Sequence, residues 1–155
     1  MFFGLSDQHK IVLITSSVGG EGKSFSTLNL AAVLSLQSHK VVIVGMDLRK
    51  PQLVQDLGVS NDIGVSTYLI GKSSLESVIC KTNVPGLDII PAGPVPPNPA
   101  ESLAKKETVN LTNELRTMYD YIIIDTPPVG IVSDAMMLMN LADINIFVLR
   151  ENYSK

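Results

Sequence analysis

Short apolar runs rich in isoleucine and valine recur along the chain and alternate with segments that have helical spacing. Such runs are typical of strands that are buried on both faces of a sheet. The segment 24–37 places Leu28, Ala31 and Ala32 on one helical face. This alternation predicts a doubly wound α/β fold, with a mainly parallel sheet and helices on both of its faces. The expected strands are 11–14, 41–44, 87–90, 121–124 and 144–149.

One shorter helix is indicated before the third of these strands. Ser73 and Glu76 have the spacing of a capping box, in which each side chain satisfies a backbone N–H of the first turn. The spacing predicts a short helix that begins after Ser73 and ends near Cys80.

A proline-rich stretch follows the third expected strand. Six of the nine prolines fall between residues 85 and 99, so we expect no regular element between Ile90 and Asn98. Asn98 and Pro99 then suit the N-cap and first position of a helix that runs to about Met118.

Composition narrows the class of protein. A length of 155 residues suits one domain, 1–155, and 45% hydrophobic with 17% charged residues excludes a disordered chain. The net charge of −3 and the pI near 5.3 give no basic surface, so we expect no nucleic-acid partner. The start lacks the pattern of a signal peptide, and the apolar segment 135–149 is too short to span a membrane. These features predict a cytoplasmic protein.

The last expected strand ends close to Lys155, where a doubly wound sheet would normally continue. We therefore expect the chain to be a fragment of a longer domain, truncated at its C-terminus.

A glycine-rich loop joins the first expected strand to the first expected helix. Glycines let backbone N–H groups approach phosphate oxygens, and the helix N-terminus adds its dipole. Lys23 can bridge the β- and γ-phosphates, and the Ser24 hydroxyl can bind Mg²⁺. Ser17 stands where the strict phosphate-loop pattern has glycine, so the match is a variant of that pattern. The candidate nucleotide-binding residues are Val18, Gly19, Gly20, Glu21, Gly22, Lys23, Ser24 and Phe25.

Two aspartates are candidates for holding the metal that accompanies a nucleotide. Asp125 ends the run YIIID, at the edge of the sheet where ligands bind in such folds. Asp47 follows the run VVIV by two residues. Each also has a purely structural interpretation, because Asp125 could cap the turn at Thr126 and Asp47 could belong to a turn.

Four segments together resemble bacterial tyrosine kinases, over residues 10–150. SSVGGEGKSFSTLNLA is similar to their Walker A motif, VVIVGMDLRKP to their Walker A′ motif and YDYIIIDTPPV to their Walker B motif. AGPVPPNPAESL resembles the proline-rich segment between the last two. The wider relatives, the partitioning and septum-site ATPases of the MinD and ParA type, carry a signature lysine where this chain has Val18. The resemblance therefore favours the kinase branch.

The resemblance implies an ATP-dependent protein-tyrosine kinase that autophosphorylates in trans and serves capsule or exopolysaccharide biosynthesis and export. Its ligands would be ATP or ADP and Mg²⁺, and its substrate another copy or a tyrosine-bearing protein. A membrane-spanning polysaccharide co-polymerase would activate it at the inner face of the plasma membrane. The catalytic residues would be Lys23, Asp47 and Asp125, and the metal ligands Ser24, Asp47 and Asp125.

The sequence departs from the family pattern in three places. Gly45 replaces the first of two aspartates in the Walker A′ motif, so phosphoryl transfer is expected to be impaired if that carboxylate acts as the base or supports the metal. The tyrosine cluster is absent, and Tyr119 and Tyr121 are expected to be packing residues, which leaves Tyr68 and Tyr153. Nothing before Lys10 resembles the ring-forming helix, so no oligomer is assumed. The alternatives are an impaired nucleotide-binding regulatory module and a positioning ATPase of the MinD and ParA type.

Overall fold

The computed structural model describes residues 10–16, 22–48, 53–127 and 134–149 of the chain. These residues form a six-stranded sheet with the order β3-β4-β2-β5-β1-β6, in which only the β3–β4 pair is antiparallel. The mainly parallel sheet and all five expected strands are confirmed, and the short edge strand β3 is added. The strands are β1 (Ile11–Ser16), β2 (Val41–Gly45), β3 (Cys80–Lys81), β4 (Leu87–Ile90), β5 (Tyr121–Asp125) and β6 (Ile144–Val148).

The central strands are buried on both faces, as their continuous apolar runs predict. Successive side chains of a strand point to opposite faces, so Ile11 and Leu13 of β1 join one core cluster while Val12 and Ile14 join the other. All four are at most 1% exposed. Burying each such side chain stabilises the fold by about 1.5–3 kcal/mol relative to exposure.

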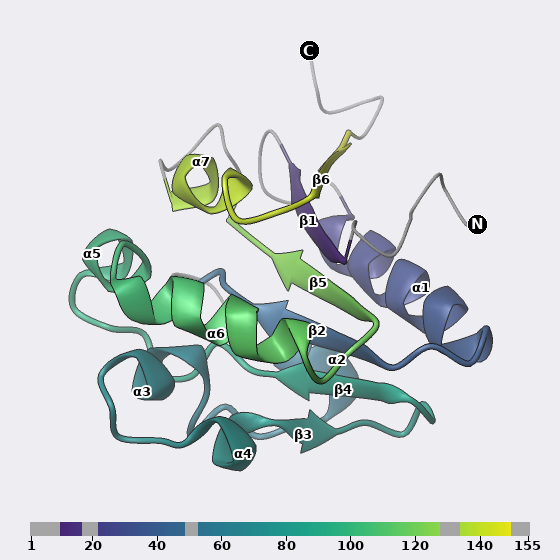
Figure 1. Ribbon diagram of the computed structural model, residues 1–155, viewed down its shortest axis with the longest axis horizontal. Coiled ribbons are helices and arrows are strands. Elements are labelled where there is room, and N and C mark those ends of the chain that lie inside the picture. The colour runs from purple at the N-terminus through teal and green to yellow at the C-terminus, as the bar shows by residue number, and fades with distance from the viewer. Residues whose placement is uncertain (1–9, 17–21, 49–52, 128–133, 150–155) are drawn as a thin grey trace.

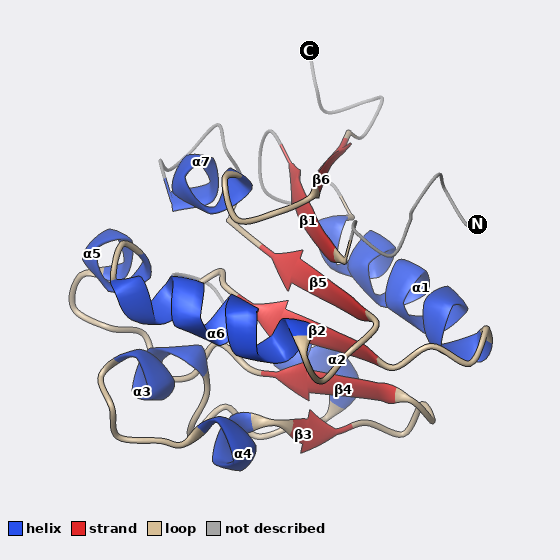
Figure 2. Cartoon of the chain, in the orientation of Figure 1, coloured by secondary structure: helices blue, strands red, loops and turns tan. Residues whose placement is uncertain are grey.

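Helices cover both faces of the sheet (Figures 1 and 2), as expected. Helices α1 and α2 pack on the face that includes Val12, and the other five pack on the face that includes Ile11. None of the described helices is long and apolar enough to cross a membrane. The helices are α1 (Lys23–Leu36), α2 (Leu53–Leu57), α3 (Val65–Leu69), α4 (Leu75–Val78), α5 (Pro99–Leu103), α6 (Lys106–Arg116) and α7 (Asp134–Met139).

The prediction of one helix from Pro99 to about Met118 is wrong in one respect, because this segment forms two helices. Asn98 is the N-cap of α5, as expected, but Lys105 adopts extended backbone (φ −70°, ψ 152°) and becomes the N-cap of α6. The break lets α5 pack against α3 and α7 while α6 packs on β5. One straight helix could not reach both places.

The capping box predicted from Ser73 and Glu76 is wrong, because the helix has its N-cap one residue later. Ser74 is the N-cap of α4, and its Oγ accepts a hydrogen bond from the Ser77 N–H at 3.3 Å. Ser73 instead donates its hydroxyl to Thr67 Oγ1 at 2.9 Å. Two adjacent serines offer the same local chemistry, so tertiary contacts decided between them. The proline-rich stretch from Pro91 to Asn98 contains no helix or strand, as expected.

Candidate nucleotide site at the carboxyl edge of the sheet

The first turn of α1 begins directly beside the edge at which β1, β2 and β5 end (Figure 1). Gly22 is the N-cap of α1 and has φ 80° and ψ 20°, a left-handed conformation that glycine adopts without strain. The Gly22 carbonyl accepts the Ser26 N–H at 3.0 Å, so the first turn of α1 has its helical hydrogen bond. Four candidate loop residues, Val18, Gly19, Gly20 and Glu21, lie outside the described residues.

Lys23 and Asp125 form an ion pair between the start of α1 and the end of β5. Lys23 Nζ donates a hydrogen bond to Asp125 Oδ1, across 102 residues of sequence. The side chains are 11% and 3% exposed, so both charges are largely removed from water. A buried charge is costly unless it is paired. The structure therefore brings together Lys23 and Asp125, which were predicted to bind phosphate and metal, respectively.

A third charge lies near this pair. Burial raises the pKa of the Asp125 carboxyl above its usual value, the charge and hydrogen bond of Lys23 oppose that rise, and the charge of Asp47 adds to it. Asp47 is 8% exposed. Asp125 and Asp47 thus place two buried acidic groups near each other at this edge of the sheet. Such an arrangement is suited to a cation.

Ser24 and Phe25 follow Lys23 in the first turn of α1. Ser24 is partly exposed. The Phe25 side chain is 72% exposed. Because that ring faces solvent, its backbone is the part of Phe25 available to line a phosphate site.

Two threonines that the sequence did not single out hold this edge together. Thr126 donates both its N–H and its hydroxyl to the Ile14 carbonyl, at 3.2 and 3.0 Å. Thr15 donates its hydroxyl to the Pro127 carbonyl at 2.9 Å. These bonds fix the end of β5 against the end of β1 and so fix the backbone beneath Asp125. Thr15 lies in the buried apolar run of β1, and a polar residue in such a run is a signal that could have indicated it.

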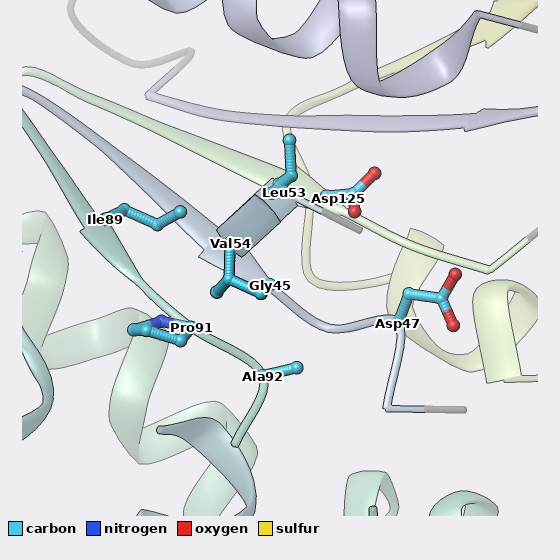
Figure 3. A pocket seen from close by; sticks show the side chains of 8 residues that line it. All are labelled: Gly45, Asp47, Leu53, Val54, Ile89, Pro91, Ala92 and Asp125. Carbon is cyan, nitrogen blue, oxygen red and sulfur yellow. The ribbon is translucent and has the colours of Figure 1, made fainter. Parts of the chain in front are cut away.

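Gly45 ends β2 and lies opposite Asp125 in the sheet register. A side chain here would be crowded, because an ideal Cβ would lie 3.0 Å from the Ala92 nitrogen and 3.4 Å from the Ile90 oxygen. Figure 3 shows the small pocket beside Gly45, with Asp47 and Asp125 on one side and Pro91 and Ala92 on the other. Position 45, where the family pattern has aspartate, is therefore packed closely against backbone atoms of the loop that follows β4.

The described tyrosines include the expected packing residues. Tyr119 is 8% exposed, and its hydroxyl donates to Asp88 Oδ2 at 2.7 Å. Burial and Asp88 raise the pKa of Tyr119 far above its usual value. Tyr121 makes an edge-to-face contact with His39, with ring centroids 5.0 Å apart. Tyr68 is half-buried, and Tyr153 lies outside the described residues.

Comparison with known proteins agrees with this geometry. The pattern of the AAA domain family matches residues 9–154. The tyrosine-protein kinase YwqD of Bacillus subtilis is 41% identical over 96% of this chain, and the chain spans 62% of its length. The crystal structure of the VpsO kinase domain is 38% identical, with a TM-score of 0.92 over 98% of this chain and 75% of that one.

A more distant structure marks the wider group. The septum site-determining protein MinD from Pyrococcus horikoshii, complexed with Mg-ADP, is 31% identical, with a TM-score of 0.77 over 90% of this chain and 57% of that one. The chain belongs to the AAA domain family and, within its MinD-like P-loop ATPases, to the bacterial tyrosine kinases.

Proposed function

We propose that the carboxyl edge of the sheet binds a nucleotide with Mg²⁺. The observation that carries this proposal is the buried Lys23–Asp125 pair, which joins the loop helix to the end of β5. The N–H groups of the loop, from Val18 to Phe25, and the α1 N-terminus would cradle the phosphates. Lys23 would bridge the β- and γ-phosphates of ATP or ADP. MinD, a relative, has been crystallised with Mg-ADP.

The residues at this edge fit Mg²⁺. Within the described ranges, no group of three or more histidine, cysteine, aspartate and glutamate side chains gathers that could hold a metal ion. Mg²⁺ is usually held by one or two carboxylates and completes its shell with phosphate oxygens and water. Asp125 and Asp47 supply such carboxylates, and Ser24 supplies a hydroxyl. When bound, the ion would neutralise charge on the phosphate oxygens.

The proposed reaction is transfer of the γ-phosphoryl group of ATP to a tyrosine hydroxyl, and the kinase names of the relatives support it. The tyrosine oxygen would form a bond to the γ-phosphorus, and the bond from that phosphorus to the β–γ bridging oxygen would break to release ADP. Lys23 would hold the phosphates in line. Asp47 would assist at the metal or accept the hydroxyl proton, because the free phenol has a pKa of about 10.

The setting of this reaction is also a proposal, drawn from the family resemblance. The chain would act as one P-loop unit of a kinase for capsule or exopolysaccharide export. Its substrate would be a second copy or another tyrosine-bearing protein. A membrane-spanning polysaccharide co-polymerase would activate it at the inner face of the plasma membrane.

The test is to incubate the full protein with Mg-ATP and its activator and to detect phosphotyrosine by mass spectrometry. Lys23→Met is the negative variant, and Lys72→Met, at an exposed lysine, is its matched control. Phosphotyrosine with the Lys72 variant and none with the Lys23 variant is expected. Equal signal from both variants would contradict the proposal.

A second function, a regulatory module that binds nucleotide but transfers phosphate slowly, is favoured by Gly45. Losing a general base costs about 10²- to 10⁴-fold in rate. If the absent carboxylate is the cause, Gly45→Asp should raise turnover while Gly45→Ala, which adds only the Cβ, should not. Equal turnover in all three proteins would remove this explanation of slow transfer.

A further inference from the structure

Asn61 lies before α3 and connects that segment to the chain that follows β4. Its Nδ2 donates to the Gly93 carbonyl at 2.9 Å, and its Oδ1 accepts the Gly93 N–H at 2.8 Å. One side chain therefore satisfies both backbone polar groups of Gly93, as a neighbouring strand would. Gly93 has φ 81°, a left-handed conformation that favours glycine. We name this pair of hydrogen bonds the Asn61–Gly93 clasp.

Backbone contacts extend the clasp along the loop. Val65 N–H donates to the Pro91 carbonyl at 2.8 Å, and Ser66 N–H donates to the Ala92 carbonyl at 2.9 Å. Gly64 has no room for a side chain, because an ideal Cβ would lie 2.6 Å from the Gly93 nitrogen. The start of α3 therefore holds the segment 91–93 from one side.

The same segment touches the candidate site from its other side. An ideal Cβ at Gly45 would lie 3.0 Å from the Ala92 nitrogen, so this loop packs directly on the end of β2. Met46 N–H donates to the Asp125 carbonyl at 2.8 Å and fixes the opposite side of the same turn. Asp47 is the next residue. The two residues before it, Gly45 and Met46, therefore touch the loop that the clasp holds and the end of β5, respectively.

We propose that Asn61 is a positioning residue for Mg²⁺ binding, which it supports by holding segment 91–93 against Gly45 and so fixing Asp47 relative to Asp125. This inference rests on the proposed function. Without the clasp the loop can move away from Gly45. The turn that carries Asp47 then loses its packing contact with this loop. Residues outside the direct ligands of a metal contribute to affinity in this way, because they hold the ligands in place. None of the hydrogen bonds described above joins the clasp to Lys23 or to the N-terminus of α1.

The experiment measures ADP affinity with and without Mg²⁺ by isothermal titration calorimetry on the full protein. For Asn61→Ala, ADP affinity in EDTA is expected to stay within about twofold of the wild type. The tightening of ADP binding by Mg²⁺ is expected to fall about tenfold, the lower end of the range for losing an outer-shell partner. Asn61→Asp keeps an acceptor for the Gly93 N–H and should give an intermediate loss. Asn83→Ala, at an exposed asparagine before β4, is the matched control.

Each result decides between the two proposals. Wild-type protein that binds no ADP, or binds it without regard to Mg²⁺, contradicts the proposed function itself. Wild-type protein that shows the Mg²⁺ effect, with an Asn61→Ala variant that retains it in full, overturns only the role of Asn61. An equal loss of affinity with and without Mg²⁺ also overturns that role, because it indicates general disruption. If Asn61→Ala does not fold, Asn61→Asp alone is judged by the same criteria.

Discussion

Asp125 lies at the carboxyl ends of the parallel strands, and Asp143 lies at their amino ends. Both are aspartate carboxyl groups, but their surroundings shift their pKa values in opposite directions. Asp125 ends β5 at the carboxyl edge, where burial raises its pKa despite the opposing effect of Lys23. Asp143 lies just before β6, at the edge where β1 begins. Burial alone would raise the pKa of Asp143, but hydrogen bonds from Arg116 and from backbone N–H groups lower it below its usual value.

The difference lies in how fully each carboxylate is satisfied. Asp143 accepts the Ile11 N–H at 2.9 Å and an Arg116 N–H at 3.1 Å, so its charge is stabilised by the fold. Asp125 is almost fully buried and lies near a second carboxylate, Asp47. A residue whose charged form the fold does not favour is a candidate for binding a ligand. The comparison assigns a structural role to Asp143 and supports a functional one for Asp125.

The largest expected effect comes from Lys23→Met, which removes the positive partner of Asp125. Phosphotyrosine formation should fall about 10³-fold, because a preorganised charge at the phosphates is lost. The free energy of unfolding should fall by about 3 kcal/mol, since a buried charge loses its partner. Without Lys23 the pKa of Asp125 rises further, so the destabilisation should grow as the pH rises above the usual carboxyl range. Urea denaturation at pH 5 and pH 8 measures it, and a loss that shrinks with rising pH would contradict this account.

Asp125→Asn and Asp143→Asn make the same change at the two edges. Asp125→Asn should lower Mg²⁺-dependent phosphotransfer about 100-fold, the scale for removing one electrostatic group from a site. Asp143→Asn should leave the rate within about twofold, because Asp143 lies at the opposite edge and has structural partners. Kinase assays of both variants with the activator present measure the contrast. Similar rates for the two variants would contradict a functional role for Asp125 and a structural role for Asp143.

Gly45→Ala tests how tightly the edge beside Asp125 is packed. The added Cβ meets the Ala92 nitrogen at 3.0 Å, so the loop that follows β4 must shift. The free energy of unfolding should fall by about 1–2 kcal/mol, a typical cost of overpacking, and Gly45→Asp should cost at least as much. Chemical denaturation measures both variants. A Gly45→Ala protein as stable as the wild type would show that the loop at Ala92 can shift without a cost in stability.

The smallest expected effect is the loss of stability in Asp143→Asn, about 1 kcal/mol at pH 7. Because the folded state lowers the pKa of Asp143, its contribution is present above the unfolded value of about 4 and is lost as the pH falls through the folded value. The variant and the wild type should therefore converge in stability as the solution is made acidic. Thermal melts between pH 7 and pH 2 measure this, and a constant difference would contradict it.

The sequence predicted the parts of the fold that depend on continuous apolar pattern. The five strands and α1 follow from their apolar runs, and Asp125 was found because it ends one of those runs. The five-residue helices α2 and α3 and the two-residue strand β3 were missed. Elements this short carry little periodicity of their own, and contacts made elsewhere in the chain hold them in place.

The site divides in the same way. Local spacing made the glycine-rich loop, Lys23 and the two aspartates candidates, because phosphate and metal binding need those residue types beside a strand end, and their roles stay a prediction. The Asn61–Gly93 clasp was not predictable, since its partners are 32 residues apart and neither has a distinctive motif. The position of Thr126 against the Ile14 carbonyl is likewise a consequence of strand order.

The amino-acid sequence by itself determined the α/β class, the position of the phosphate loop and the replacement of a family aspartate by Gly45. Each of these depends on residues that are neighbours in the chain. Only the tertiary structure decided that Lys23 pairs with Asp125 and that the Ala92 backbone occupies the space beside Gly45. Those contacts join segments that parallel pairing of β1, β2, β4 and β5 brings to one edge, and burial there then sets the charge balance around Asp125.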